Sequence, residues 1–299
     1  MRREEFKYRT GFIAGAVVIL IGLALQLIVG PLNWEVFSSP VNFIALVVLC
    51  LLIAQTYALR KRFAAASFLM KRHAAVPCLV YVTLLTALMG LIRQVPANEV
   101  STDALGLSRM LSFWPFVLVY LWMTFIVGLV AFKSLLSLRT VNLRNISVLL
   151  CHLGLFIALS TATLGNADMQ RWKMVCLIDK PTDRVINERR QVKQMSVAIE
   201  LKRFILETSD EGMPRRFASD IVIHTKQGEQ ISATVDVNNP VKVKGWKIYQ
   251  FGYDVEAGAA SSYSILELIR DPWLPAVYSG IYMLLLGALL MFFTNNKNN

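Results

Sequence analysis

The chain has 299 residues, of which 55% are hydrophobic and 17% are charged, and its formal net charge is +11. A soluble globular domain contains about a quarter charged residues, so this composition argues against one. The hydrophobic residues also occur in long uninterrupted blocks, with groups of Lys and Arg in the short segments between them. Nucleic-acid binding is not supported, because no basic surface with interleaved aromatic residues is apparent outside these segments.

Six segments are apolar over a length that can cross a bilayer, whose hydrocarbon core of about 30 Å requires roughly 20 helical residues. None has a charged residue well inside it, and they are expected at about 11–32, 39–59, 74–92, 111–132, 145–165 and 273–293. The first is longer than the apolar run of a secretory signal, and no small-residue cleavage site follows it. We therefore expect it to be retained as the first span.

Lys and Arg residues are concentrated on alternate sides of these spans. They precede the first span and fill the loops before the third and fifth: Arg2, Arg3, Lys7, Arg9, Arg60, Lys61, Arg62, Lys71, Arg72, Lys133, Arg139 and Arg144. The loops on the opposite side hold only Arg93 and Arg109. By the positive-inside rule, both termini are expected in the cytoplasm. The predicted location is the bacterial inner membrane, with the region after the fifth span in the periplasm.

The region from 166 to 271 differs from the rest, since it has no apolar block and carries 16 basic and 15 acidic residues. Alternation of apolar and polar residues in "SVAIELKRFILET" and "ISATVDV" predicts strands, and "KQGEQ" and "NNPVKVKGW" supply turn signals. Five or six short strands are expected, in an antiparallel sandwich or open barrel.

The predicted fold class is therefore an α-helical membrane protein with six transmembrane helices and one periplasmic antiparallel β-rich domain between helices five and six. The predicted domains are the first five helices at 1–165, the β-rich domain at 166–271, and the sixth helix with a short cytoplasmic tail at 272–299.

The four cysteines do not predict a redox or zinc site. Cys50, Cys78 and Cys151 lie in predicted spans, only Cys176 lies in the exported region, and there is no C-x-x-C motif. Small apolar packing is the expected role of the membrane cysteines.

Ionisable residues inside the spans are where function is sought in a membrane protein. The three histidines are His73, His152 and His224. His224 lies in a strand pattern, where a surface position is expected. His73 follows a Lys-Arg pair at the cytoplasmic end of the third span, where a solvated interfacial residue is the simpler interpretation. His152 lies about two turns inside the fifth span.

His152 stands in "LLCHLGLF", and three roles are open to it. Its imidazole could be satisfied by Ser or Thr on a neighbouring helix, could relay protons, or could bind a metal or haem. A relay requires Asp or Glu at similar depth, and the spans contain none. Apolar neighbours at helical spacing suit an axial haem ligand, and here they are Val148, Leu149, Leu155 and Phe156.

Four segments in order resemble the ResB (CcsB) family of cytochrome c biogenesis proteins, the haem-handling half of system II. They are "LSFWPFVLVYLWMTFIVGLVAFKSL", "LLCHLGLFIALSTATLG", "VDVNNPVKVKGWKIYQFGYD" and "IRDPWLPAVYSGIYMLLLGALLMFF". The resemblance begins near residue 110 and continues to the end of the chain. The leading pair of spans, at 11–59, is similar to the longer arrangement of fused CcsBA-type proteins.

The resemblance implies a role in moving haem b outward across the inner membrane and presenting it to apocytochrome c. It implies that His152 is an axial haem ligand, that a CcsA-like membrane protein supplies the second histidine, and that no other metal is bound. The chain has no tryptophan-rich W-G-x-W-type segment, so the partner is expected to hold haem at the outer face. We expect no catalysis by the chain alone, but a subunit of a holocytochrome c synthase.

Further site residues follow from the same resemblance. His73 could lie where haem enters. A surface for the partner or for apocytochrome c could include Asn238, Asn239, Pro240, Tyr249, Gln250 and Tyr253. For that stretch a purely architectural role is the alternative, with Gly245 and Gly252 in turns and the aromatic residues in a core. Membrane lipid is an expected partner, and nucleic acid is not.

Two other functions compete. A scaffolding factor without haem would retain function when His152 is replaced by glycine. A transporter for a small solute would show internal repeats and broken helices, which the sequence does not.

Overall fold

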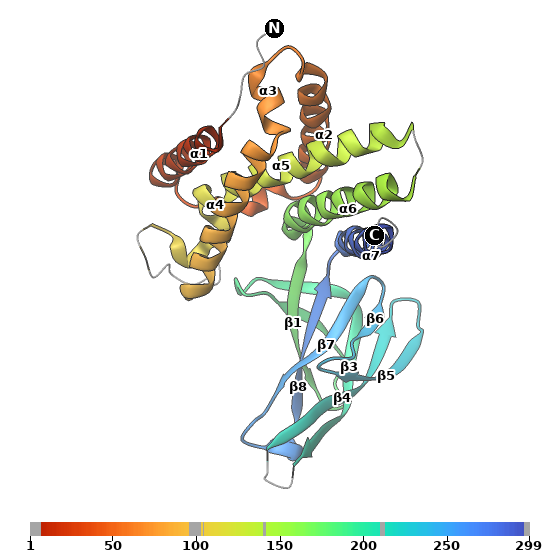
Figure 1. The fold of residues 1–299 in the computed structure, drawn as a ribbon. Helices are drawn as coiled ribbons and strands as arrows, with labels where there is room; N and C mark the ends of the chain where they lie inside the picture. The colour runs from red at the N-terminus through yellow and green to blue at the C-terminus, as the bar shows by residue number, and fades with distance from the viewer. Residues whose placement is uncertain (1–6, 96–102, 104, 140–141, 210–212, 296–299) are drawn as a thin grey trace. The chain divides into compact units, whose positions relative to one another are not determined.

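The computed structural model describes residues 7–95, 103, 105–139, 142–209 and 213–295. The chain divides into two compact units, shown in Figure 1. The helical unit comprises Met1–Asp168 and Pro272–Asn299, and the sheet unit comprises Met169–Asp271.

The helical unit contains six long apolar helices and one short one. The long helices are α1 (Tyr8–Val29), α2 (Val41–Leu59), α4 (Arg72–Leu91), α5 (Trp114–Leu136), α6 (Leu143–Gly165) and α7 (Leu274–Asn295). Each is long and apolar enough to cross a membrane, and within the described residues there are six such helices, as predicted. The short α3 (Ala64–Leu69) was not predicted, and it lies in the loop between the second and third spans.

Local signals mark the ends of these helices. Gly30 ends α1 with φ of 78°, a backbone conformation that glycine adopts without strain, and its N–H donates to the Gln26 carbonyl. Pro115 stands in the first turn of α5, where its missing N–H costs no hydrogen bond. Asn142 caps α6, since its side-chain oxygen accepts the N–H of Asn145 at 2.7 Å.

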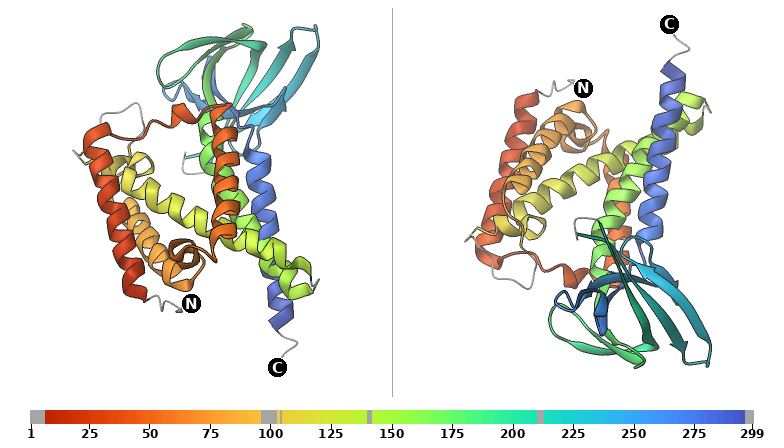
Figure 2. Two further views of the ribbon diagram at one scale, coloured as in Figure 1. Left: turned by 90° about the horizontal axis from the view of Figure 1, so that it is seen from above. Right: turned by 90° about the horizontal axis from the view of Figure 1, so that it is seen from below.

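Helices α6 and α7 lie side by side along much of their length (Figure 2). Glycines allow their backbones to approach closely. A Cβ atom added to Gly154 would lie 2.6 Å from the Gly280 carbonyl oxygen, and one added to Gly280 would lie 2.6 Å from the Ala158 nitrogen. One added to Gly287 would lie 2.6 Å from the Cys151 nitrogen. Small residues are the usual means of close helix packing in a bilayer, so this contact fixes α6 against α7.

Asp168 joins three parts of the helical unit. Its carboxylate accepts hydrogen bonds from the Ser39 backbone N–H at 2.7 Å, from Asn42 Nδ2 at 2.8 Å and from Trp273 Nε1 at 2.8 Å. Asn42 is fully buried, and the Trp273 ring lies 4.5 Å from that of Phe43. Asp168 follows α6, Ser39 precedes α2 and Asn42 lies in its first turn, and Trp273 precedes α7, so one carboxylate holds the ends of three helices together.

The variant Asp168→Ala should therefore destabilise the helical unit by about 2 kcal/mol, because Asn42 and Trp273 would keep buried donors without this acceptor. Thermal unfolding of the detergent-purified protein, followed by far-ultraviolet circular dichroism, measures the loss. Asp168→Asn retains one acceptor oxygen and should lie between wild type and the alanine variant. Equal unfolding temperatures for all three proteins would contradict the role of Asp168.

The sheet unit is one antiparallel sheet of eight strands in the described residues, with order β5-β4-β3-β2-β1-β8-β7-β6. The strands are β1 (Gln170–Leu177), β2 (Thr182–Ile186), β3 (Val192–Thr208), β4 (Pro214–Thr225), β5 (Gln230–Asp236), β6 (Val241–Val243), β7 (Trp246–Tyr253) and β8 (Tyr263–Arg270). The sequence predicted an antiparallel β-rich domain but only five or six strands. Strands β1, β2 and β6 were missed, because β1 has apolar residues on both faces and the other two are very short.

The sheet curls around a single core. Its buried centre includes Met174 from β1, Ile199 from β3, Ile223 from β4, Ile248 from β7 and Leu268 from β8, each fully buried. Strands far apart in the sheet order make contact across this core. The Tyr253 ring of β7 stacks on Phe204 of β3 at 4.7 Å, for example. The β3–β4 region therefore faces β7 and β8.

Candidate functional site

The imidazole of His152 is oriented by its own helix. Its Nδ1 lies 2.8 Å from the carbonyl oxygen of Val148, one turn earlier in α6. A carbonyl oxygen only accepts hydrogen bonds, so Nδ1 carries the proton and donates it. The lone pair of a neutral imidazole then resides on Nε2, for which the described residues supply no hydrogen-bond partner. This is the arrangement that a histidine ligand requires, with one nitrogen anchored and the other available.

The structure also bears on the simplest alternative for His152. A neighbouring Ser or Thr was one way to satisfy the ring, but the polar contact is to the α6 backbone. The side chain itself is half-buried. On the same helix, Leu149 and Phe156 are each 8% exposed, and Phe156 packs with Ile53 and Leu129. Helix α6 is thus held by α7 on one face and by α2 and α5 on another.

His73 lies at the start of α4, in a different helix pair. Its ring is 4.7 Å from that of Tyr8, and its backbone carbonyl faces Gly11 of α1. Its Nδ1 is buried and has no hydrogen-bond partner within the described part of the chain. The structure does not bring His73 into contact with His152.

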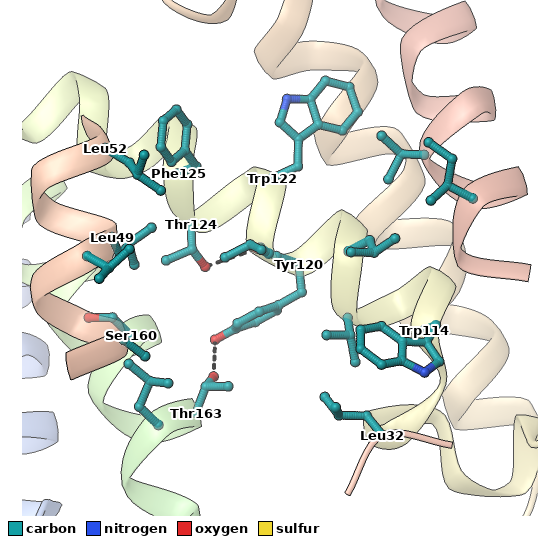
Figure 3. Close-up of a pocket in the computed structure, with 18 of the residues that line it drawn as sticks. Leu32, Leu49, Leu52, Trp114, Tyr120, Trp122, Thr124, Phe125, Ser160 and Thr163 are labelled. Atoms are coloured by element: carbon teal, nitrogen blue, oxygen red, sulfur yellow. Dashed lines mark hydrogen bonds between the residues drawn. The ribbon is translucent and has the colours of Figure 1, made fainter. Parts of the chain in front are cut away.

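An apolar cavity of about 890 Å³ opens between α1, α2, α5 and the end of α6 (Figure 3). Such a volume is in the range of pockets that accept small organic molecules. Two of its polar groups are hydrogen-bonded to each other and to the backbone: the Tyr120 hydroxyl donates to the Leu159 carbonyl at 3.0 Å and accepts from Thr163 Oγ1 at 3.0 Å. Trp34, Trp114 and Trp122 contribute to its walls. The sequence did not predict this cavity, and neither His152 nor His73 lines it.

The residues predicted for a partner surface are divided by the structure. Asn238 and Asn239 are exposed in the loop before β6, and Pro240, Tyr249 and Tyr253 are half-buried. Gln250 lies inside the sheet instead of on a surface, since it is only 2% exposed. Its amide and the hydroxyls of Ser219 and Ser264 form a buried hydrogen-bonded group, with Ser219 Oγ 2.7 Å from Gln250 Oε1. Side chains alternate between the two faces of a strand, and Gln250 shares the inward face of β7 with Trp246 and Ile248. The prediction that Gln250 belongs to a partner surface was therefore wrong.

Two further residues of the sheet unit are structural. Gly245 has φ of 82° in the turn between β6 and β7, which explains the glycine there. His224 is only partly exposed, and its Nε2 lies 2.9 Å from Glu200 Oε2. Hydrogen bonds from Lys202 and from His224 lower the pKa of Glu200 below its ordinary value. His224 therefore has a carboxylate partner in its own sheet.

Six helices that can cross a membrane and one antiparallel sheet unit define a membrane protein with a folded β unit between its last two spans. Residues 139–263 match the model of the ResB-like family, a segment that contains α6 with His152 and most of the sheet unit. The resemblance to the ResB (CcsB) family is thereby confirmed.

Curated relatives show the same similarity. The chain is 28% identical over 169 residues to a cytochrome c biogenesis protein CcsB of Prochlorococcus marinus subsp. pastoris, which covers 56% of this chain and 38% of the relative. A CcsB of Prochlorococcus marinus strain MIT 9301 is 26% identical over 170 residues, with the same coverage. The match thus spans less than two fifths of these relatives. Among solved structures, a cytochrome c haem lyase CcmF gives a TM-score of 0.38 at 14% identity, covering 95% of this chain and 44% of that one.

Proposed function

We propose that this chain acts in cytochrome c biogenesis. Together with a CcsA-like membrane protein, it moves haem b across the bacterial inner membrane and presents it to apocytochrome c. The relatives named CcsB and the match over residues 139–263 support this role. The observation that carries the proposal is the anchored Nδ1 of His152, which leaves Nε2 available to iron.

Haem is the cargo in this proposal, and the chain's own contribution is to position one ligand. The Val148 carbonyl holds the His152 ring by its Nδ1–H, and the close α6–α7 contact holds the helix. Six-coordinate haem iron needs a second axial donor. His224 is hydrogen-bonded to Glu200, and His73 belongs to another helix pair, so the second histidine comes from the partner.

The orientation follows from the distribution of Lys and Arg residues. We place both termini in the cytoplasm and the region 166–271 in the periplasm, where apocytochrome c receives haem. His73, near the cytoplasmic side, is then a residue that haem passes on entering. The exposed Asn238 and Asn239, with the neighbouring Pro240, Tyr249 and Tyr253, form the surface for the partner or for apocytochrome c.

The proposal is tested by co-expressing the chain with a CcsA-like partner and purifying the complex in mild detergent. We expect the haem absorbance of a six-coordinate, histidine-ligated iron in the co-purified complex. A colourless complex that binds no added haem, yet supports cytochrome c maturation in cells, would overturn the haem role and favour the scaffolding function. The chain should also restore cytochrome c maturation in a bacterial strain from which the corresponding protein has been deleted. If it does not, both the haem role and the scaffolding function are refuted.

A further inference from the structure

The end of the sheet unit that is joined to the helices is basic. Gln170, the first residue of β1, pairs with Arg270, the last residue of β8, so both chain connections leave from one end of the sheet. The turn between β6 and β7 and the turn between β4 and β5 lie at this same end, because Lys244 Nζ contacts Gln227 Oε1 at 3.2 Å. Five cations from these segments form what we call the cationic rim: Lys226, Lys242, Lys244, Lys247 and Arg270.

The strand register places cations of the rim next to one another. Lys242 is the cross-strand partner of Lys247, and both lie on the outer face, because their neighbours Val243 and Trp246 point into the core. Lys247 in turn pairs with Ile269 of β8. Like charges in directly opposite positions of an antiparallel pair repel. An anion close to both ammonium groups would offset the repulsion between Lys242 and Lys247.

The segments that carry the rim also contain Glu229 and Asp271, but neither carboxylate is within ion-pair distance of a rim cation among the described residues. None of the five cations of the rim has a carboxylate within ion-pair distance among the described residues. Four of them are exposed and Lys247 is half-buried.

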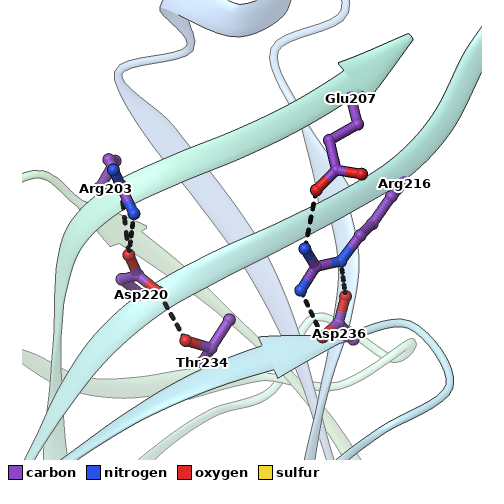
Figure 4. A network of polar contacts seen from close by, with 6 residues as sticks. All are labelled: Arg203, Glu207, Arg216, Asp220, Thr234 and Asp236. Atoms are coloured by element: carbon purple, nitrogen blue, oxygen red, sulfur yellow. Dashed lines mark hydrogen bonds and ion pairs between the residues drawn. The ribbon is translucent and has the colours of Figure 1, made fainter. Parts of the chain in front are cut away.

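Two arginines farther from this end of the sheet, by contrast, are paired with carboxylates of the protein (Figure 4). Arg203 binds Asp220 at 2.9 Å, and Arg216 binds both Asp236 and Glu207 at 2.8 Å. The hydrogen bond from Arg216 holds the pKa of Asp236 below its ordinary value. These two arginines, unlike the five cations of the rim, therefore have their countercharges within the protein.

The short connection between β8 and α7 indicates which anion lies near the rim. Only three residues separate Arg270 from Leu274, where the apolar α7 begins. The four residue steps from Arg270 to Leu274 span at most about 14 Å when extended, so Arg270 cannot be farther than that from the start of a membrane-crossing helix. Neighbouring strands are about 5 Å apart, which keeps Lys247 within reach of the same surface. The charged layer found at that depth is the lipid headgroups.

We propose that the cationic rim binds anionic phospholipid headgroups of the leaflet into which α6 and α7 insert. The sheet unit is then held to the bilayer by its own lysines in addition to its two covalent connections. This inference does not depend on the haem role, because it uses only the sheet unit and the membrane-crossing helices.

The test compares the full-length protein in nanodiscs of phosphatidylcholine and in nanodiscs that contain phosphatidylglycerol. We expect slower amide hydrogen exchange in residues 241–248 in the anionic discs, and we expect high salt to remove the difference. Each lysine near an anionic leaflet raises the affinity of a protein for that leaflet by about fivefold. The double variant Lys242→Gln/Lys247→Gln should therefore weaken the binding of phosphatidylglycerol on the order of 25-fold. The matched control Lys180→Gln/Arg215→Gln removes two exposed cations from other parts of the same sheet and should retain the wild-type difference.

Equal exchange in the two kinds of nanodisc for the wild-type protein would overturn the proposal. So would a double variant that retains phosphatidylglycerol like wild type, or a control variant that loses it equally. Protection by free inorganic phosphate in phosphatidylcholine discs would show a soluble-anion site instead of a lipid site. Protection by polyglutamate and not by phosphatidylglycerol would show a surface for an acidic protein.

Discussion

Replacing His152 with glycine should remove the haem absorbance of the complex with a CcsA-like partner. Loss of a group that merely orients a metal ligand already costs about 10- to 100-fold in affinity, so loss of the ligand itself should lower bound haem by at least about tenfold. The measurement is the haem absorbance per mole of purified complex. Because glycine leaves space where the ring was, added imidazole should enter and restore part of the absorbance.

The controls separate ligation from folding. His224→Gln removes a histidine that binds Glu200 in the sheet unit, and it should leave the absorbance unchanged. The glycine variant should also co-purify with the partner in wild-type yield and retain the wild-type α-helical circular dichroism. A coloured wild-type complex together with an equally coloured His152→Gly complex would show that His152 is not the ligand, while leaving a role in cytochrome c biogenesis intact.

The helical unit was predictable from sequence because the bilayer fixes the length and the composition of a spanning helix. The six apolar blocks became α1, α2, α4, α5, α6 and α7 with only small differences at their ends. Short α3 was missed, since six residues in a loop give no periodic signal. In the sheet unit, β3, β4 and β5 were predictable where one face is buried. Strand β1 was not, because Val175 and Leu177 are apolar yet exposed.

The candidate site was predictable only where one residue conflicts with its surroundings. A histidine in an apolar run is visible in the sequence, and so His152 could be selected. Features made by pairs of distant residues leave no local pattern. Asp168 and Trp273 are 105 residues apart, and Ser219 and Gln250 are 31 apart. Gln250 was consequently assigned to a surface, although its partners inside the sheet determine its position.

The close contact between α6 and α7 gives a second large expected effect. The variant Gly280→Ala should destabilise the helical unit by about 3 kcal/mol, because the new methyl group would lie 2.6 Å from the Ala158 nitrogen and 2.7 Å from the Gly154 carbonyl oxygen. Both are backbone atoms, so the helices must separate. The measurement is the unfolding temperature in detergent. The matched control is Gly90→Ala in α4, where a Cβ atom meets nothing within 4 Å and the substitution should be neutral or stabilising.

A double variant shows whether one contact causes the loss. Gly154→Ala introduces a methyl group 2.6 Å from the Gly280 carbonyl oxygen, in the same interface. Once the helices have separated to admit one methyl group, a second costs less, so the double variant should lose less stability than the sum of the single variants. Additive losses would mean that the two glycines act independently. A Gly280→Ala protein as stable as the Gly90→Ala control would mean that α6 is not held by α7, and that the rigid support inferred for His152 must come from α2 and α5.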